Sequence, residues 1–305
     1  MVQHIIKTQT FTREFMNELF VLAREMRDNV KKNKENKELS GKVVATLFYE
    51  ESTRTRLSFE SAALRLGAST ISTANARQFS SVAKGETLED TIRTLNGYAD
   101  CIVLRYYEEG GAARAAHVSN MPVINAGDGS GQHPTQSLLD VFTIEDELGQ
   151  VDGTSLALVG DLKHGRTVHS LAYLMGKFED ISMLLVSPKN LQMPEDILKY
   201  LKRHKIKYKE TTDLEKVKDC DVVYQTRIQK ERFDSLAEYE ASRGKLVITE
   251  EVANKMKKDA IILHPLPRVD EIAYGVDSNH RAKYFQQAEN GLYVRMALLK
   301  MLLGK

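Results

Sequence analysis

The stretch Lys42–Gly67, KVVATLFYEESTRTRLSFESAALRLG, carries the pattern on which the fold prediction depends. Its apolar run Val43–Phe48 leads through a polar junction into a segment whose apolar residues recur at helical spacing. The sequence therefore predicts a buried strand that passes directly into a helix. The junction crowds hydroxyl and guanidinium groups together: Ser52, Thr53, Arg54, Thr55 and Arg56.

The same alternation of short apolar runs and amphipathic segments continues along the chain. Strand-like runs occupy residues 101–105, 122–127, 155–161, 181–187, 221–227 and 260–268. Helical patterns lie between them, and the alternation restarts near residue 150. Strands that alternate with helices indicate parallel sheets in α/β layers. We expect an α/β protein with two doubly wound parallel-sheet domains joined by interdomain helices, one domain being residues 1–134 with 286–305 and the other residues 135–285.

Composition excludes several classes of protein. The net charge of +1 provides no overall basic field to attract nucleic acid. The two cysteines, Cys101 and Cys220, cannot build a disulfide framework and have no zinc-site spacing, so we expect both to be buried in strands. No run approaches the ~20 apolar residues of a membrane span, and the first twenty residues lack a signal-peptide pattern. We expect a soluble protein of the reducing cytoplasm, with no membrane or nucleic-acid partner.

Polar and cationic groups follow nearly every strand-like run. Ligands of open α/β sheets gather at the carboxyl ends of strands, so these groups are expected to line binding sites. In chain order they are residues 52–56, Arg105, residues 133–136, residues 162–167, residues 227–232 and residues 264–268.

The junction at residues 52–56 is typical of an anion site. A helix N-terminus attracts negative charge through its free N–H groups and its dipole. Ser52 stands where an N-cap is expected, with Arg54 and Thr55 in the first turn. Because an arginine opposes the dipole there, Arg54 is best explained by a bound anion such as phosphate. The alternative is that both arginines of the junction are surface charges at a helix start.

Four more side chains are candidates for the same pocket, and each has a plainer interpretation. Arg105 is either a second clamp or an edge charge. His133 precedes Pro134, which disfavours α geometry and places the imidazole on a turn, although a lone histidine is more often structural. Gln136 lies one helical turn further on. Lys84, in the polar segment 80–86, is otherwise a solvated loop lysine.

A competing interpretation comes from Gly160–Thr167, GDLKHGRT, which differs by one residue from the phosphate-binding P-loop pattern. An arginine replaces the lysine of that pattern, and Asp161 introduces a carboxylate where phosphate would bind. A nucleotide hydrolase is therefore a weak alternative, and no G-x-G-x-x-G supports a dinucleotide site.

Taken together, six motifs resemble those of the carbamoyltransferase family, and within it the members that act on aspartate. They are FYEESTRTRLSFE, SSVAKGETLEDT, GDGSGQHPTQSLLD, GDLKHGRTVHS, TRIQKER and HPLPRVDEI, and the likeness runs almost end to end. The members that act on ornithine usually carry His-Cys-Leu-Pro where this chain has His264-Pro265-Leu266-Pro267. The resemblance implies transfer of a carbamoyl group from carbamoyl phosphate to L-aspartate, the committed step toward pyrimidines. An ornithine or other amine acceptor is the alternative.

The resemblance also implies a role for each candidate residue. Those that hold the phosphate are Ser52, Thr53, Arg54 and Thr55, with Ser80 and Lys84 closing over it. Those that polarise the carbamoyl carbonyl are Thr55, Arg105 and His133. Those that hold the carbamoyl amide are Gln136 and the backbone carbonyls of Leu266 and Pro267. Those that bind aspartate are Arg166 and Arg227, with Lys84 and Gln229 beside them. Glu50 takes part in closing the two domains.

The family pattern implies a homotrimer in which Ser80 and Lys84 reach the neighbouring subunit's site, with no metal and no cofactor. A separate regulatory chain, found with related members, is left open by the sequence. His164 stands where the family more often has tyrosine; it is either a tuner of pH response or a passive replacement. A non-catalytic paralogue is the last alternative, and the presence of all these residues counts against it.

Overall fold

The computed structural model describes residues 4–228, 235, 239 and 244–304, which form two compact units. The first unit is Met1–Leu139 with Glu289–Lys305, and the second is Asp140–Ala288. The divisions, expected after residues 134 and 285, fall after residues 139 and 288. Each lies inside a helix, α6 (Pro134–Leu148) or α11 (Tyr284–Leu303).

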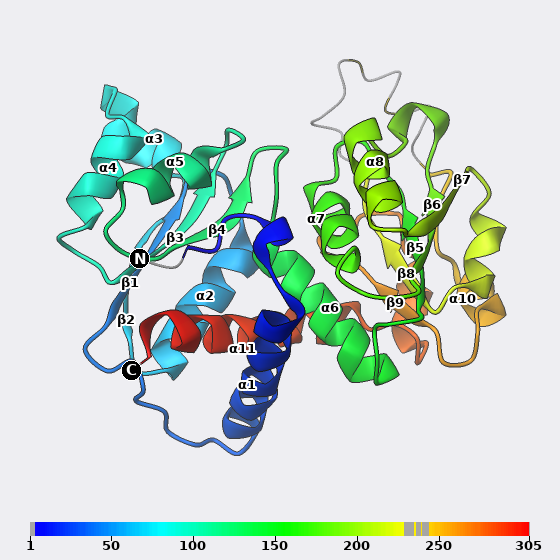
Figure 1. Ribbon diagram of the computed structural model, residues 1–305, viewed down its shortest axis with the longest axis horizontal. Helices are drawn as coiled ribbons and strands as arrows, with labels where there is room; N and C mark the ends of the chain where they lie inside the picture. Colours follow the sequence, from blue (N-terminus) through cyan, green and yellow to red (C-terminus); the bar gives the residue numbers. More distant parts are fainter. Residues whose placement is uncertain (1–3, 229–234, 236–238, 240–243, 305) are drawn as a thin grey trace. The chain divides into compact units, whose positions relative to one another are not determined.

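The first unit contains a four-stranded parallel sheet in the order β2-β1-β3-β4 (Figure 1). Its strands are β1 (Val43–Phe48), β2 (Ser69–Thr73), β3 (Cys101–Tyr106) and β4 (Val123–Asp128). The chain moves from β1 to one neighbour and then returns to the other side, so the strand order reverses between β1 and β3. Such a switch point is where open α/β sheets bind ligands.

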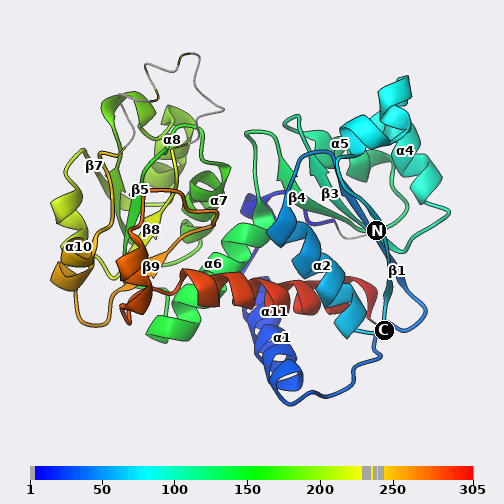
Figure 2. The ribbon, with the colours of Figure 1, turned by 180° about the vertical axis from the view of Figure 1, so that it is seen from behind.

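Helices surround this sheet, and side chains cap the starts of some of them. They are η1 (Thr8–Thr10), α1 (Arg13–Lys31), α2 (Thr53–Arg65), α3 (Ala76–Phe79), η2 (Ser81–Lys84), α4 (Leu88–Leu95) and α5 (Gly111–Val118). Thr12 and Thr87 cap α1 and α4 by accepting backbone N–H groups. Figure 2 shows α2 and α11 next to each other, where Arg295 Nη1 donates to Ser58 Oγ at 2.6 Å.

The second unit contains a five-stranded parallel sheet in the order β7-β6-β5-β8-β9. Its strands are β5 (Ser155–Val159), β6 (Ser182–Val186), β7 (Lys207–Thr211), β8 (Val222–Gln225) and β9 (Ile261–Leu263). The described helices are α7 (Arg166–Met175), η3 (Lys189–Leu191), α8 (Glu195–Arg203), η4 (Leu214–Asp219), α10 (Glu250–Lys255) and η6 (Tyr274–Ser278). The strand order reverses between β5 and β8, which places the switch point of this unit there.

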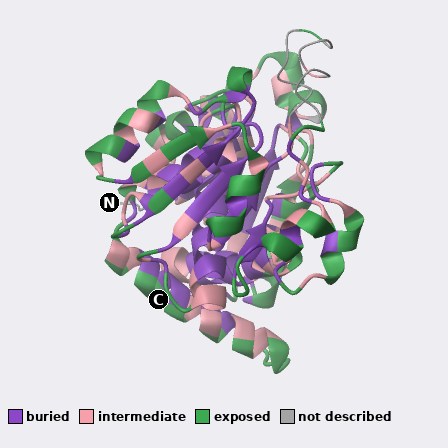
Figure 3. Ribbon diagram, turned by 90° about the vertical axis from the view of Figure 1, so that its right-hand side faces the viewer, coloured by how far each residue is buried: buried purple, intermediate pink, exposed green. Residues whose placement is uncertain are grey.

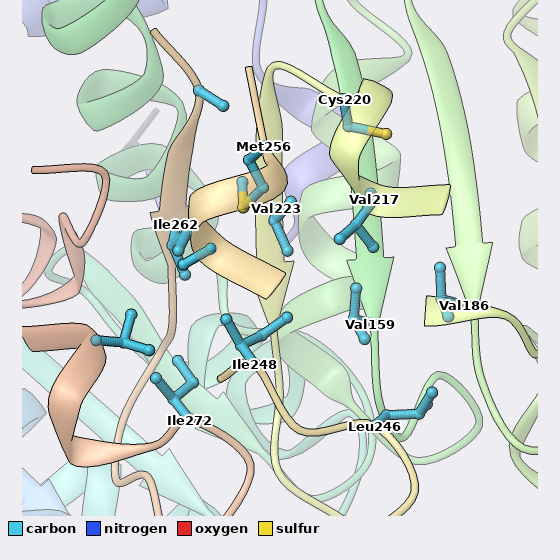
Figure 4. Packing of buried hydrophobic residues seen from close by; sticks show 14 of the residues in the cluster. Val159, Val186, Val217, Cys220, Val223, Leu246, Ile248, Met256, Ile262 and Ile272 are labelled. Atoms are coloured by element: carbon cyan, nitrogen blue, oxygen red, sulfur yellow. The ribbon is translucent and has the colours of Figure 1, made fainter. Parts of the chain in front are cut away.

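One cluster of the core of the second unit packs against this sheet. Figure 4 shows side chains of β5, β6, β8, β9, η4 and α10 pointing toward one another. Val159, Val223, Ile248 and Ile262 are fully buried in this cluster. In Figure 3 most strand residues are coloured as buried, whereas the helices carry exposed residues on their outer faces. This apolar packing fixes the strand ends from which the polar site residues emerge.

A half-buried polar contact joins the start of β5 to the start of β8. Asp221 accepts hydrogen bonds from Ser155 N at 2.8 Å, from Ser155 Oγ at 2.7 Å and from Lys257 Nζ at 2.7 Å. Burial alone would raise the pKa of the Asp221 carboxyl, but the hydrogen bonds from Lys257 and Ser155 outweigh it and hold the pKa below its usual value.

The predicted fold class, two parallel-sheet α/β domains, is confirmed. Both cysteines are buried free thiols. Cys101 begins β3 as expected, whereas Cys220 is the C-cap of η4 and precedes the strand β8. Of the helices that the structure describes, none is both long and apolar enough to span a membrane.

Candidate active site

The junction between β1 and α2 forms a helix N-terminus whose Ser52 hydroxyl is not used as a cap. Ser52 has extended backbone, and its side chain makes no capping hydrogen bond. No acidic residue lies in the first turn of α2, where acids normally complement the dipole. Arg54 and Thr53 are exposed in this turn, and Ser52 is half-buried. The turn can therefore present hydroxyl, guanidinium and backbone N–H donors to an anion.

The two arginines of this junction have different surroundings. Arg56 Nε lies 3.8 Å from Glu60 Oε1, one helical turn further along α2. Glu60 also accepts hydrogen bonds from Thr46 Oγ1 at 2.9 Å and from Ser72 Oγ at 2.6 Å. Arg56 is therefore tied to the sheet through Glu60, whereas Arg54 is exposed in the first turn of α2.

The structure brings Thr55 and His133 together beside this junction. Thr55 Oγ1 lies 3.5 Å from His133 Nε2, although 78 residues separate them, and both side chains are buried. His133 directly precedes α6, as Pro134 predicted, and its carbonyl accepts a hydrogen bond from Gln136 N at 3.0 Å. The hydroxyl and the imidazole can approach one small oxygen together.

Arg105, at the end of β3, is pinned between a carbonyl and a carboxylate. Its Nη1 donates to Ala126 O at 3.2 Å, and its Nε lies 3.5 Å from Glu50 Oε2. Only 12% of the Arg105 side chain is exposed, which keeps its charge poorly screened. The resemblance assigns Glu50 to domain closure, and within the first unit its carboxylate pairs with Arg105.

Ser80 and Lys84 lie on the segment formed by α3 and η2. Ser80 Oγ caps η2 by accepting from Val82 N at 3.2 Å, and it donates to Ala76 O. Lys84 ends η2 and is exposed. The guanidinium of Arg77 lies 4.6 Å from the ring centre of Tyr107, which follows β3. This cation–π contact fastens the segment to the sheet.

In the second unit, the β5 exit is organised by a fully buried carboxylate. Asp161 Oδ1 accepts from Lys163 N at 3.1 Å and from His164 N at 2.9 Å, and its Oδ2 lies 3.2 Å from His164 Nδ1. A P-loop would turn such backbone N–H groups toward phosphate, so the geometry argues against that alternative. Sequence reasoning treated Asp161 only as an objection to a P-loop and missed its structural role.

The predicted aspartate ligands leave this sheet at its switch point. Arg166 is the first residue of α7 and Arg227 lies two residues beyond β8; both are partly buried. As at α2, no acid occupies the first turn of α7. Gln229 lies outside the described residues. Leu266 and Pro267 follow the neighbouring strand β9 in a turn where Leu266 has φ +54°.

Among the described residues, no group of three or more histidine, cysteine, aspartate or glutamate side chains is arranged to hold a metal ion. The site residues instead provide cations, hydroxyls and one imidazole. Such a set suits anionic, oxygen-rich small molecules.

Comparison with known proteins gives the same result from both halves of the chain. The carbamoyl-phosphate-binding domain model of aspartate/ornithine carbamoyltransferases matches residues 3–146, and the Asp/Orn-binding domain model matches residues 152–302. The chain is 56% identical over 301 residues to the chloroplastic aspartate carbamoyltransferase of Arabidopsis thaliana, covering 98% of this chain and 77% of that protein. It is 51% identical over 303 residues to the aspartate carbamoyltransferase catalytic subunit of Methanocaldococcus jannaschii, covering 99% and 98%.

Solved structures of aspartate transcarbamoylases have the same fold as this chain. The M. jannaschii catalytic subunit of aspartate transcarbamoylase matches with a TM-score of 0.92 at 51% identity, covering 99% of this chain and 98% of that one. Trypanosoma cruzi aspartate transcarbamoylase in complex with N-(phosphonacetyl)-L-aspartic acid matches with a TM-score of 0.94 at 40% identity, covering 99% and 96%.

Proposed function

The chain belongs to the aspartate/ornithine carbamoyltransferase family, and we propose that its first unit holds carbamoyl phosphate while its second unit supplies the ligands of aspartate. The reaction is transfer of the carbamoyl group to the amino group of L-aspartate, giving N-carbamoyl-L-aspartate and phosphate, the committed step toward pyrimidines. The observation that carries the choice of aspartate is 51–56% identity to aspartate-acting members over nearly the whole chain. The segment His264-Pro265-Leu266-Pro267 supports the same choice over ornithine.

The phosphate is held at the N-terminus of α2. Its ligands are Ser52, Thr53, Arg54 and Thr55, completed by Ser80 and Lys84 of a neighbouring subunit. Two features support this assignment: the Ser52 side chain makes no capping hydrogen bond, and no acidic residue lies in the first turn of α2.

The carbamoyl carbonyl is polarised by Thr55, Arg105 and His133. The close approach of Thr55 to His133 supports a shared oxygen ligand. Donors that are already in place when oxyanion charge develops can each contribute about 3–4 kcal/mol of transition-state stabilisation. Gln136 and the backbone carbonyls of Leu266 and Pro267 hold the carbamoyl amide.

The two carboxylates of aspartate are bound by Arg166 and Arg227, with Lys84 and Gln229 beside them. Both substrates are anions that repel each other in water, so clustered cations are needed to bring them into reacting distance. The neutral amine then attacks the carbamoyl carbon, the bond from carbon to the bridging phosphate oxygen breaks, and the departing phosphate takes the amine proton. His133 serves as a hydrogen-bond donor in this scheme, and no separate base is required.

The active assembly that we propose is a cytoplasmic homotrimer. The exposed position of Lys84 on a segment anchored through Arg77 supports its use by a neighbouring subunit. Mixing inactive Lys84→Ala and Arg54→Ala trimers with subunit exchange should restore some activity. Exchange of subunits without recovery of activity would count against shared sites.

The cytoplasmic location is supported by the two cysteines, because buried free thiols suit a reducing compartment. A regulatory chain remains an optional partner.

The test of the reaction is a product assay with carbamoyl phosphate and either L-aspartate or L-ornithine, scored for ureido product and phosphate. Product with aspartate alone is expected, and product with ornithine alone would overturn the roles of Arg166 and Arg227.

The phosphate site is tested by two variants of the junction. Arg54→Ala should lower turnover at least a hundredfold. Arg56→Ala, which loses its pairing with Glu60, is the matched control and should lower turnover less than tenfold. Equal losses would remove the phosphate role from Arg54.

A further inference from the structure

His264, the residue after β9, has a ring whose protonation pattern is dictated by its neighbours. The side chain is 1% exposed. Its Nδ1 lies 2.7 Å from Leu266 N, and its Nε2 lies 2.7 Å from Glu271 Oε1. A backbone N–H can only donate, so Nδ1 must be the acceptor and the ring proton sits on Nε2, where it donates to the carboxylate.

Glu271 completes the arrangement because its carboxylate accepts hydrogen bonds from three donors. Its Oε1 accepts from His264, and its Oε2 accepts from Val269 N and Asp270 N, both at 3.2 Å. Burial alone would raise the pKa of Glu271, but the hydrogen bond from His264 and those from the backbone hold it below its usual value. The carboxylate is therefore ionised at neutral pH and keeps the ring in one tautomer.

The backbone of His264 is anchored independently of its ring. His264 N donates to Gln287 Oε1 at 2.8 Å, and Gln287 Nε2 donates to Asp140 Oδ1 at 2.6 Å. Tyr224 OH donates to the other oxygen of Asp140 at 2.9 Å. All four residues are buried within the second unit. A change confined to the His264 ring thus leaves the path of the main chain at the β9 exit supported.

The part that depends on the ring is the turn at residues 265–267. Leu266 adopts φ +54°, a left-handed conformation that costs a branched residue about 1–2 kcal/mol. Its N–H points back to His264 Nδ1, so that bond orients the peptide plane before Leu266 and restrains the turn. Without an acceptor there, one of the contacts that hold Leu266 in this conformation is lost, and its packing against the core cluster has to hold it alone.

We propose that His264, oriented by Glu271, is a positioning residue that sets the selectivity of the enzyme for the carbamoyl group. The inference rests on the proposed function, in which the carbonyls of Leu266 and Pro267 accept hydrogen bonds from the carbamoyl NH2. Acetyl phosphate has the same shape with a methyl group in place of that NH2, and a methyl group cannot donate. A site built to bond an N–H discriminates strongly against the analogue that lacks it. The preference for carbamoyl phosphate over acetyl phosphate therefore reports the placement of the two carbonyls.

Two substitutions separate the two edges of the ring. His264→Gln places an amide donor near the original Nε2, keeping the contact with Glu271 while removing the acceptor for Leu266 N. His264→Asn places a carbonyl oxygen near the original Nδ1, keeping that acceptor and losing Glu271. We expect His264→Gln to reduce the ratio of carbamoyl phosphate to acetyl phosphate affinity about tenfold, as the loss of one to two hydrogen bonds predicts. His264→Asn should keep most of the ratio.

The measurements are inhibition constants for acetyl phosphate and inorganic phosphate, the KM for carbamoyl phosphate, and an unfolding midpoint for each variant. Inorganic phosphate affinity should stay within about twofold of the unmodified enzyme, because no carbamoyl group is involved. A folded His264→Gln variant with an unchanged ratio would overturn the proposal. Equal loss of the ratio in both variants would also do so, because it would reduce His264 to a general structural role.

A measurement on the unmodified enzyme protects the test against misfolding of the variants. Imidazole 15N chemical shifts should show His264 protonated at Nε2 alone, and a proton on Nδ1 would exclude the bond from Leu266 N. Failure of the proposed function is distinguishable: the unmodified enzyme would then form no carbamoyl aspartate. Failure of this inference alone leaves that turnover intact.

Discussion

Gly160→Ala should damage the enzyme through one contact between neighbouring strand ends. Gly160 follows β5 with φ +118°, a conformation that residues with a Cβ rarely adopt. A Cβ there would lie 2.2 Å from Thr226 O, whereas real Cβ atoms essentially never approach closer than 3.0 Å. The Thr226 carbonyl would have to retreat by about 0.8 Å, and Arg227 is the next residue along the chain.

Thr226 cannot retreat cheaply. Its N–H donates to Val159 O at 2.8 Å, and the preceding Gln225 donates to Leu246 O at 3.1 Å. We expect about 1–2 kcal/mol of backbone strain and a further 1–3 kcal/mol from the forced contact. Misplacing a substrate ligand by close to 1 Å can cost about a hundredfold in rate, so kcat/KM for aspartate should fall at least tenfold.

Gly153→Ala is the matched control for backbone strain. Gly153 also belongs to the second unit and has φ +77°, but a Cβ there would meet nothing within 4 Å. It should lose about 1 kcal/mol and leave aspartate kinetics unchanged. Urea unfolding and steady-state rates at varied aspartate measure both effects. The reasoning is refuted if the two variants match in unfolding free energy and in kcat/KM for aspartate.

Three further outcomes test other contacts. Asp221→Asn should lower the unfolding free energy by about 1–2 kcal/mol at pH 7, and the deficit should shrink at pH 3. The reason is that the folded pKa of Asp221 lies below its usual value, so its contribution is lost as pH falls through that pKa; equal deficits at both pH values would contradict this. Cys101 and Cys220 should resist iodoacetamide at pH 8 in the folded protein. The reason is that burial raises the pKa of both thiols, that of Cys220 to about 11. Alkylation of either cysteine, detected by mass spectrometry, would contradict this prediction. Tyr107→Leu should lower turnover about two- to fivefold, because it removes the aromatic ring that holds Arg77. Tyr107→Phe keeps the ring and should leave turnover unchanged. Equal turnover in the two variants would show that the cation–π contact does not anchor the segment.

The central strands could be predicted from sequence because burial on both faces makes them continuous apolar runs. The strands β2 (STIST) and β7 (KYKET) were missed for the opposite reason. Both are edge strands with exposed and half-buried positions, so they carry no apolar run. Their pairing with β1 and β6 comes from backbone hydrogen bonds and register, which no local pattern reveals.

The candidate site was predictable at strand ends but not in its pairings. The junction at residues 52–56 predicted an anion site with Arg54 as a ligand, but the sequence indicated no partner for Arg56, which the fold places beside Glu60. The approach of Thr55 to His133 joins residues 78 positions apart, which only the fold can bring together. Glu50 was assigned to domain closure, and its pairing with Arg105 depends on how β1 and β3 end side by side.

In the function that we propose, the two units use the same local arrangement to bind two different anions. In each, the helix after the first strand of the switch point begins with an arginine in its first turn and has no acid there to complement the dipole: Arg54 in α2 and Arg166 in α7. With respect to the helix dipole, a cation at that end of a helix is unfavourable by about 0.3–1 kcal/mol. An anion bound between the guanidinium and the helix N–H groups would reverse the sign of this interaction. If phosphate and aspartate bind at these helix starts as we propose, relief of this unfavourable interaction contributes to their binding energy.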